Sequence, residues 1–424
     1  MMSLNEEIQN VKIQNWRNTI EVLKNDKIVF EHLMTKKRED FKSINEVRDH
    51  FCNDLIDSDI KKLWAVYVWV AHNFEFDKDG YKGDTINSLY NNGKVLYEGF
   101  ANIFQYICKA LGFRCDYVKG LFKGENYLVE KNKIDPKKIN QHWNKVNLGK
   151  EKYFVHVGFA ATRSKLDGGK TEFRPFFFLV PPEVFIYSFY PEDRIDQGLT
   201  SSNEVKRHDW IKLPQLAVEF FFYNFRCSTN SHCCEIVSTD SNPVLMEFEA
   251  PDECTMKGEL IRVVDKKKCP NNLFIQRDFN TKKFIVEVLP ISRESLILYL
   301  KGRNQTVKDY SLIANFLIKA EKIITPQPPL YCKTFFLDKI CLIKPKTIEL
   351  KAGTEYTFKV EVKENKVALL NDQSTVIGYF NEVSKSTVST VCSFKYTPDE
   401  SSKVLKICLD LPTSFKPAFE YQIV

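Results

Sequence analysis

Three polar residues, Tyr97, Gln141 and His156, each hold a fixed place in a short motif and are the first candidates for chemistry. Tyr97 opens a stretch of small and apolar residues that runs to Phe104 and predicts the start of a helix. A nucleophilic thiol gains most at such a place, because the free N–H groups and the dipole of a helix N-terminus stabilise the thiolate. A tyrosine has a reference pKa of about 10 and stays a neutral phenol near neutral pH.

The other two residues belong to predicted strands. Gln141 opens the sequence Gln-His-Trp-Asn-Lys-Val, and His156 ends an aromatic run that begins at Lys152. A carboxamide forms hydrogen bonds but carries no titratable proton, and an imidazole acts as a base only when a nucleophile lies within hydrogen-bond reach. These residue types therefore do not make up a nucleophilic system by themselves.

The order and spacing of the motifs resemble the transglutaminase-like superfamily, and in particular the branch of kyphoscoliosis peptidase and hillarin. Further segments carry the same resemblance: 64–77, 118–124, 178–193, 213–214 and 220–222. Together they extend from about Leu63 past Phe222. Several ordered motifs at compatible spacing are more specific than any one of them.

The resemblance implies a Cys-His-Asp triad whose positions are occupied here by Tyr97, Gln141 and His156, so we predict that the chain is not an enzyme. His142 could replace the base only if the strand register changed, because adjacent strand side chains point to opposite faces. Tyr97 could fill the space of a lost thiol and bond to Gln141 or His156. Alternatively, the cleft around these residues and Trp143, here called the relic cleft, could bind a peptide or small molecule without turning it over.

Cysteine spacing predicts neither disulfides nor a metal site. Twelve cysteines are scattered between Cys52 and Cys408, a pattern typical of buried thiols in a cytosolic protein. The densest group is Cys227, His232, Cys233 and Cys234. Its adjacent cysteines lack the usual gap of about two to four residues, so we predict no metal, and the motifs indicate no cofactor. Two other cysteines flank a helix end and a strand start away from Tyr97, and neither is predicted to replace the nucleophile: Cys108 and Cys115.

Composition and charge exclude several classes of protein. The net charge is +6, from 61 basic and 55 acidic residues, and the basic runs 36–38 and 266–268 are short and isolated. Such runs are usually solvated, so we predict no nucleic-acid partner. The N-terminal residues do not resemble a secretory signal, and the apolar stretch 176–190 is broken by Pro181-Pro182, so we expect a cytoplasmic protein without a membrane span.

The fold prediction is an α+β transglutaminase-like, papain-like core followed by two immunoglobulin-like β-sandwich modules. We expect a helical N-terminal extension over 1–57 and the core over 58–226, with helices first and an antiparallel sheet after Phe113. Alternating apolar segments from Cys227 onward predict the sandwiches, 227–325 and 326–424. The proline-rich join at 325–329 cannot continue a strand and marks the boundary between them.

Our functional prediction is a pseudoenzyme that binds other proteins and acts as a scaffold, with cytoskeletal proteins among its partners as the resemblance implies. Two alternatives remain open. One is a cysteine protease or transglutaminase with a non-standard nucleophile, and the other is a ligand or peptide sensor that uses the relic cleft. The residues around Tyr97 discriminate between them, because catalysis needs a thiolate and a base there.

Overall fold

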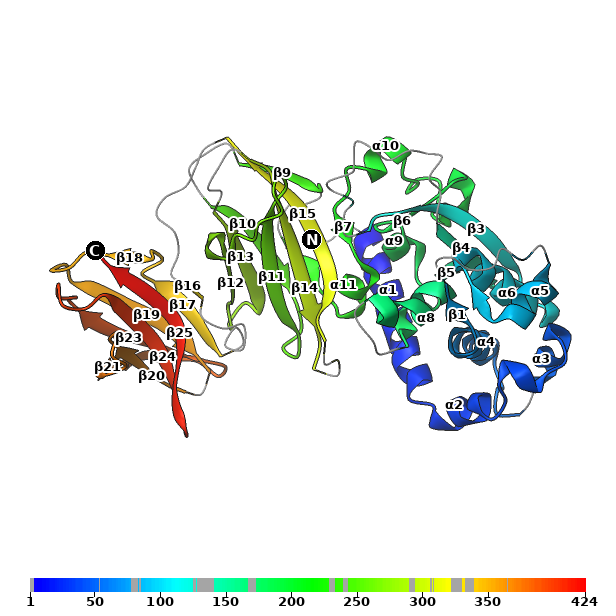
Figure 1. Cartoon of the computed structure of the whole chain (residues 1–424), viewed down its shortest axis with the longest axis horizontal. Coiled ribbons are helices and arrows are strands. Elements are labelled where there is room, and N and C mark those ends of the chain that lie inside the picture. The colour runs from blue at the N-terminus through cyan, green and yellow to red at the C-terminus, as the bar shows by residue number, and fades with distance from the viewer. Residues whose placement is uncertain are drawn as a thin grey trace. The chain divides into compact units, whose positions relative to one another are not determined.

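The computed structural model describes residues 4–52, 54–77, 83, 85–124, 127, 141–166, 173–228, 233–238, 243–289, 294–305, 307, 309–321, 330–331, 339–363 and 365–424. It divides into two compact units, Met1–Ile211 and Lys212–Val424. Figure 1 shows that most of the helices belong to the first unit and that the second unit consists mainly of strands. In the described part of the chain, no helix is long and apolar enough to cross a membrane.

Helices make up most of the first unit. The longer ones are α1 (Leu4–Lys24), α2 (Lys27–Met34), α3 (Ile44–His50), α4 (Asp59–Asn73), α5 (Ile86–Asn92), α6 (Tyr97–Ala110) and α8 (Val157–Leu166). Short helical turns are η1 (Arg38–Asp40), η3 (Pro175–Phe177), α9 (Pro182–Phe185), η4 (Arg194–Gln197) and α10 (Arg207–Trp210). Helix α4 begins where the Ser58 side chain accepts the Lys61 N–H, and every residue from Leu63 to Val70 is buried. A helix that is apolar all round is a core helix.

One antiparallel sheet completes the first unit. It consists of β3 (Cys115–Phe122), β4 (Gln141–Leu148), β5 (Glu151–Val155) and β6 (Phe189–Pro191), in the order β5-β4-β3-β6. A small parallel pair, β1 (Glu75–Phe76) and β2 (Lys94–Val95), flanks α5 in the chain, and β2 directly precedes α6. The predicted α+β core with an antiparallel sheet after Phe113 is confirmed.

The N-terminal helices belong to the first unit and pack on it. The Trp16 indole N–H of α1 donates to the Phe178 carbonyl at 2.8 Å, and this bond is buried. The ring of Phe51, directly after α3, meets that of Trp69 on α4 edge-on, with 6.0 Å between the centroids and 79° between the ring planes. The predicted helical extension is therefore part of the same core.

The second unit holds two β-sandwiches. One sheet of the first sandwich contains β8 (Arg226–Cys227), β10 (Val244–Glu249), β12 (Leu273–Arg277) and β13 (Lys283–Val288). Its other sheet contains β7 (Gln215–Leu216), β9 (Glu235–Ser238), β11 (Thr255–Arg262), β14 (Leu296–Arg303) and β15 (Ser311–Ala320). One sheet of the second sandwich contains β16 (Leu330–Tyr331), β18 (Glu349–Leu350), β20 (Lys366–Leu370), β21 (Val376–Tyr379), β24 (Val404–Leu411) and β25 (Ser414–Ile423). Its other sheet contains β17 (Ile340–Lys344), β19 (Tyr356–Val362), β22 (Asn381–Lys385) and β23 (Thr390–Tyr396). The two predicted all-β modules are confirmed.

The division between the units lies earlier than the predicted boundary at 226/227. Strand β7 pairs with Ala314–Asn315 of β15, and Leu216 is buried. The following helix α11 (Val218–Phe222) also buries most of its residues. This aromatic segment therefore belongs to the first sandwich, although its sequence resembles the end of the core. The proline-rich join predicted at 325–329 lies outside the described residues.

Polar contacts join the two sandwiches of the second unit. The Leu342 N–H donates to Gln276 Oε1 at 3.0 Å, and both groups are buried. Lys346 Nζ pairs with Glu287 Oε1 at 2.7 Å, and Asn280 Nδ2 donates to Glu361 Oε1 at 2.6 Å. A buried N–H that loses its acceptor costs free energy, so Gln276 stabilises this junction.

We predict that Gln276→Met lowers the unfolding free energy of the second unit by about 1–3 kcal/mol, because it keeps the side-chain volume and removes the acceptor of the Leu342 N–H. All five tryptophans lie in the first unit. Urea unfolding followed by far-UV circular dichroism should therefore shift while the tryptophan fluorescence transition stays in place. The exposed Gln373→Met is the control. Equal midpoints for the two variants would contradict the prediction.

Candidate functional site

The N-terminus of α6 carries Tyr97 as its first residue. The preceding Leu96 offers no side-chain cap. The half-buried Tyr97 ring stacks on Phe76 at 4.5 Å between centroids and meets Phe159 edge-on at 5.3 Å. It also lies perpendicular to the His156 ring at 5.6 Å. The position that the resemblance assigns to a thiol is therefore filled by a packed aromatic ring.

Gly158 makes room for this ring. A Cβ atom at Gly158 would lie 2.6 Å from Tyr97 Cδ1 and 3.5 Å from Phe100 Cδ2. The first distance is shorter than carbon atoms tolerate, so a side chain at position 158 would displace the phenol. Tyr97 and Gly158 are thus mutually adapted.

His156 is completely buried at the end of β5, with an exposed fraction of 0%. Its ring stacks on Phe159 at 4.2 Å, and its Nδ1 accepts the Phe159 N–H at 3.2 Å. Burial lowers the pKa of His156 to about 3, with His142 adding a smaller effect. The neutral ring therefore carries its proton on Nε2, and Nε2 has no hydrogen-bond partner among the described residues. A neutral donor cannot replace the carboxylate that orients a base.

Gln141 and Trp143 lie two residues apart on β4 and so face the same side of the sheet. Both are buried, and the Gln141 Oε1 and Trp143 Nε1 atoms lack hydrogen-bond partners within the described segments. The Trp143 ring packs against Phe185 at 5.4 Å and Phe189 at 5.6 Å. The structure brings the rings of Tyr97 and His156 into contact. That the Gln141 side chain lies beside these two rings stays a prediction.

The opposite face of β4 holds a polar chain that the sequence did not reveal. Tyr117 Oη hydrogen-bonds His142 Nδ1 and also contacts Glu98 Oε1 at 3.4 Å. Burial lowers the pKa of His142 and raises the pKa of Tyr117. Asn144, on the same face, donates to the Ala101 carbonyl of α6 at 3.0 Å. Strand alternation separates His142 from Gln141 as expected, but only the register shows that α6 covers the His142 face.

Burial raises the pKa of several thiols in the described segments. The cysteines described there are all free, and burial raises the pKa of Cys108, which hydrogen-bonds Cys115. Burial likewise raises the pKa of Cys341 to about 12. A thiol with a raised pKa is a poorer source of thiolate.

The predicted absence of a metal at Cys227, His232, Cys233 and Cys234 involves His232, which lies outside the described residues. Over the segments that are described, no three His, Cys, Asp or Glu side chains gather to hold a metal ion. Cys234 is buried and Cys233 is exposed, so these neighbours do not face one point.

The burial of neutral His156 predicts a specific pH dependence of stability. Its folded pKa of about 3 lies below the reference value of 6.5, so its contribution is complete above pH 6.5 and is lost as the pH falls toward 3. The loss amounts to about 1.4 kcal/mol per pH unit within that window. His50 and His142 also have lowered pKa values and add to the slope.

We expect His156→Asn, which keeps an acceptor for the Phe159 N–H, to flatten this slope. Urea unfolding followed by tryptophan fluorescence between pH 6.5 and 4.5 measures it for the first unit. The exposed His208→Asn should leave the slope unchanged. Identical slopes for His156→Asn and the unsubstituted protein would show that His156 does not titrate on unfolding.

Comparison with known proteins agrees with the geometry. Residues 50–158 match the family model of the transglutaminase-like superfamily. Hillarin of Drosophila melanogaster is 24% identical over 212 residues, which cover 46% of this chain and 25% of hillarin. The Lim and transglutaminase domain protein ltd-1 of Caenorhabditis elegans is 27% identical over 209 residues, 46% of this chain and 28% of that protein.

Kyphoscoliosis peptidase of Mus musculus is 22% identical over 159 residues, which cover 36% of this chain and 24% of the peptidase. The matched segments thus span about a quarter of the length of these relatives. A transglutaminase crystal structure is 13% identical, covers 41% of this chain and 36% of its own, and has a TM-score of 0.20. The assignment rests on the family model and the curated relatives and not on that structure. The first unit of this chain carries a transglutaminase-like domain, on the branch that includes hillarin and kyphoscoliosis peptidase.

Proposed function

We propose that this chain is a catalytically inactive transglutaminase-like protein that works by binding other proteins. The observation that carries the proposal is the packed Tyr97 ring at the N-terminus of α6, against Phe76, Phe159 and His156. Acyl transfer by this superfamily's triad needs a thiolate, a base and a group that orients the base. A phenol, a carboxamide and a buried neutral imidazole supply none of these.

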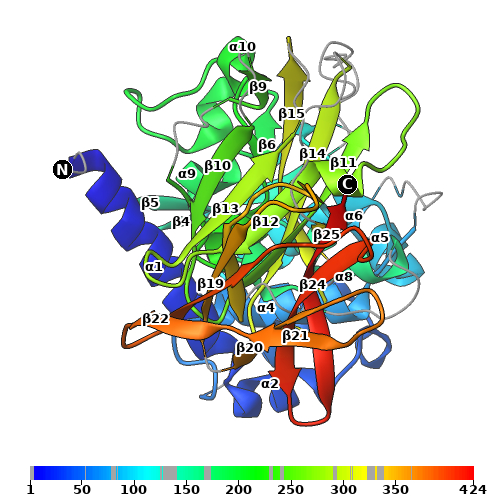
Figure 2. The same ribbon diagram turned by 90° about the vertical axis from the view of Figure 1, so that its left-hand side faces the viewer.

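The second unit offers a surface for protein binding. Three large apolar side chains are exposed within ten residues: Tyr379, Val383 and Val388, at 47%, 54% and 44%. They belong to β21, β22 and the turn that follows β22. Each of these strands is the last in its sheet, and Figure 2 shows the chain passing directly from one to the other. Edge strands and exposed apolar side chains are features of docking surfaces.

Cytoskeletal proteins in the cytoplasm are the partners we propose, because the chain resembles the kyphoscoliosis peptidase and hillarin branch. Fold analogy alone does not identify a partner. The sandwiches act in this proposal as the docking modules, and the first unit as a folded core without turnover.

A second candidate function is a ligand sensor. Three buried polar atoms, Gln141 Oε1, Trp143 Nε1 and His156 Nε2, have no partner among the described residues. Buried polar groups usually form hydrogen bonds, so a water or a small polar ligand would satisfy them. The relic cleft would then be the functional site.

The inactive reading predicts no amine incorporation into glutamine substrates and no peptide cleavage by the purified chain, with or without calcium. The reason is chemical, since the nucleophile position holds a phenol. Product formation is measured by mass spectrometry against an active transglutaminase. Activity that iodoacetamide abolishes, with the label mapped to one cysteine, would overturn the proposal.

The docking proposal predicts that Tyr379→Ser, Val383→Ser and Val388→Ser together remove co-sedimentation with purified cytoskeletal filaments. These side chains are exposed, so each substitution should change stability by less than about 0.5 kcal/mol. The matched control is the exposed apolar set Val11→Ser, Val22→Ser and Ile28→Ser in the first unit. Filament binding that survives the β21–β22 substitutions would contradict the proposed surface. The sensor would be favoured if no filament binding is found and a ligand raises the melting temperature of the chain in a way that depends on Tyr97.

A further inference from the structure

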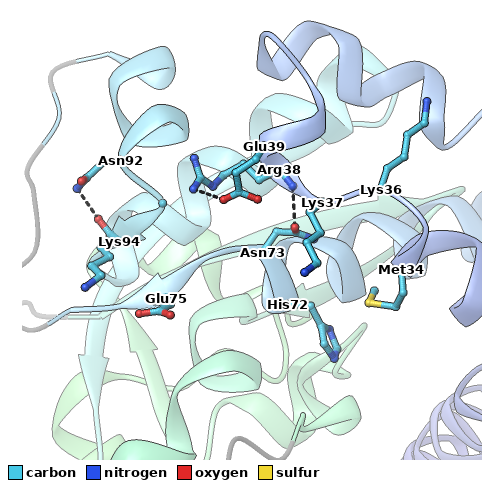
Figure 3. Close-up of a pocket in the computed structure, with 11 residues that line it drawn as sticks. Met34, Lys36, Lys37, Arg38, Glu39, His72, Asn73, Glu75, Asn92 and Lys94 are labelled. Atoms are coloured by element: carbon cyan, nitrogen blue, oxygen red, sulfur yellow. Dashed lines mark hydrogen bonds and ion pairs between the residues drawn. The ribbon is translucent and has the colours of Figure 1, made fainter.

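A pocket in the first unit lies outside the relic cleft. Its volume is about 520 Å³, within the range of small-molecule sites. Figure 3 shows its lining side chains, which come from the end of α2 and the segment after it, the end of α4, and the strands β1 and β2 with the end of α5. The residues that line it are Met34, Lys36, Lys37, Arg38, Glu39, His72, Asn73, Glu75, Asn92, Gly93 and Lys94.

Three side chains, those of buried Trp69 and Tyr90 and partly buried Asn73, hold the basic segment 36–38 in place. The Trp69 indole N–H donates to the Lys36 carbonyl at 3.0 Å. The Arg38 N–H donates to Asn73 Oδ1 at 2.8 Å, and the Tyr90 hydroxyl donates to the Arg38 carbonyl at 2.7 Å. The backbone is therefore fixed before any ligand arrives, which reduces the entropy lost on binding.

Arg38 stabilises the wall of the pocket. Its Nη1 donates to the carbonyls of Tyr90 at 3.0 Å and Asn91 at 3.1 Å, at the C-terminal end of α5. Its Nη2 pairs with Glu39 at 2.5 Å. A Cβ atom at Gly93 would lie 2.7 Å from Nη2, so glycine lets the guanidinium sit against the backbone. Because a cation at a helix C-terminus offsets the partial negative charge there, Arg38 neutralises that end of α5.

Lys37 and Lys94 remain available to a ligand. Both are exposed, and neither forms an ion pair with any residue of the described ranges. Figure 3 shows their side chains coming from different parts of the pocket, one beside His72 and one beside Glu75. With His72 counted as neutral, the four cations and two carboxylates of the lining leave a net charge of +2.

We propose that this pocket binds a phosphate monoester. Such a group carries a charge of about −1.5 to −2 at pH 7, which matches the net charge of the lining. Lysine ammonium groups bind phosphate as point charges, and Lys37 and Lys94 supply two of them. A phosphorylated side chain of a partner and a small phosphate ester present the same group. The proposal is independent of the relic cleft and of the β21–β22 surface.

The Trp69 indole provides a local signal, because it donates to the Lys36 carbonyl at the pocket wall. The 15N-labelled full chain is titrated by NMR with phosphoserine peptide, glycerol 3-phosphate, the unphosphorylated peptide and acetate. We expect a saturable shift of the Trp69 indole resonance with both phosphate monoesters, weakened by salt, and none with the other two probes. The tighter of the two phosphate probes identifies the source of the group.

Lys37→Gln with Lys94→Gln should weaken the binding of either phosphate probe at least about fivefold, since two charge contacts are lost. Lys150→Gln, on the β4–β5 turn, with Lys152→Gln, exposed on β5, changes the net charge equally and should leave binding unchanged. Unchanged melting temperatures establish that both variants fold. Equal weakening in the two pairs, binding of acetate as tight as that of the phosphates, or no saturable shift would each overturn the proposal.

Discussion

The packing of α6 against β4 on one side and α8 on the other determines which groups surround the candidate site of the first unit. Asn144 ties β4 to the Ala101 carbonyl of α6, and Gly158 brings α8 within van der Waals contact of Tyr97. Because both contacts fall within the first two turns of α6, they define which groups surround its N-terminus. That geometry places the Tyr97 phenol among the rings of Phe76, Phe159 and His156.

Aromatic side chains continue this environment across the sheet. Phe122 and Phe189 stack at 4.9 Å, and Phe185 and Phe189 at 4.2 Å. Since such rings bring little polarity, the imidazole of His156 lies in a medium that disfavours its charged form, which accounts for its low pKa. The high phenylalanine content of the chain, 33 residues, thus bears on the chemistry of this region as well as on its stability.

The sequence predicted the elements of the core because their motifs are local: a helix start at Tyr97, a strand at Gln141, and β-strand alternation beyond Cys227. It did not predict which face of β4 meets α6, since alternation defines two faces without saying what covers each. It also took Lys36, Lys37 and Arg38 for a solvated run. Arg38 instead caps the end of α5 through the carbonyls of Tyr90 and Asn91, 52 and 53 residues later, and such a contact leaves no trace in local sequence. For the same reason the sequence placed the aromatic segment after Ile211 in the core, since only the pairing of β7 with β15 joins it to the first sandwich.

The fit between Tyr97 and Gly158 makes the present state of the site hard to reverse by mutation. Replacing the phenol with a thiol would leave a void between Phe76, Phe159 and Gly158, and large-to-small changes at fully buried aromatic positions cost about 3–5 kcal/mol. A half-buried ring such as that of Tyr97 would cost part of that. Replacing Tyr97 with cysteine would therefore lower the stability of the first unit.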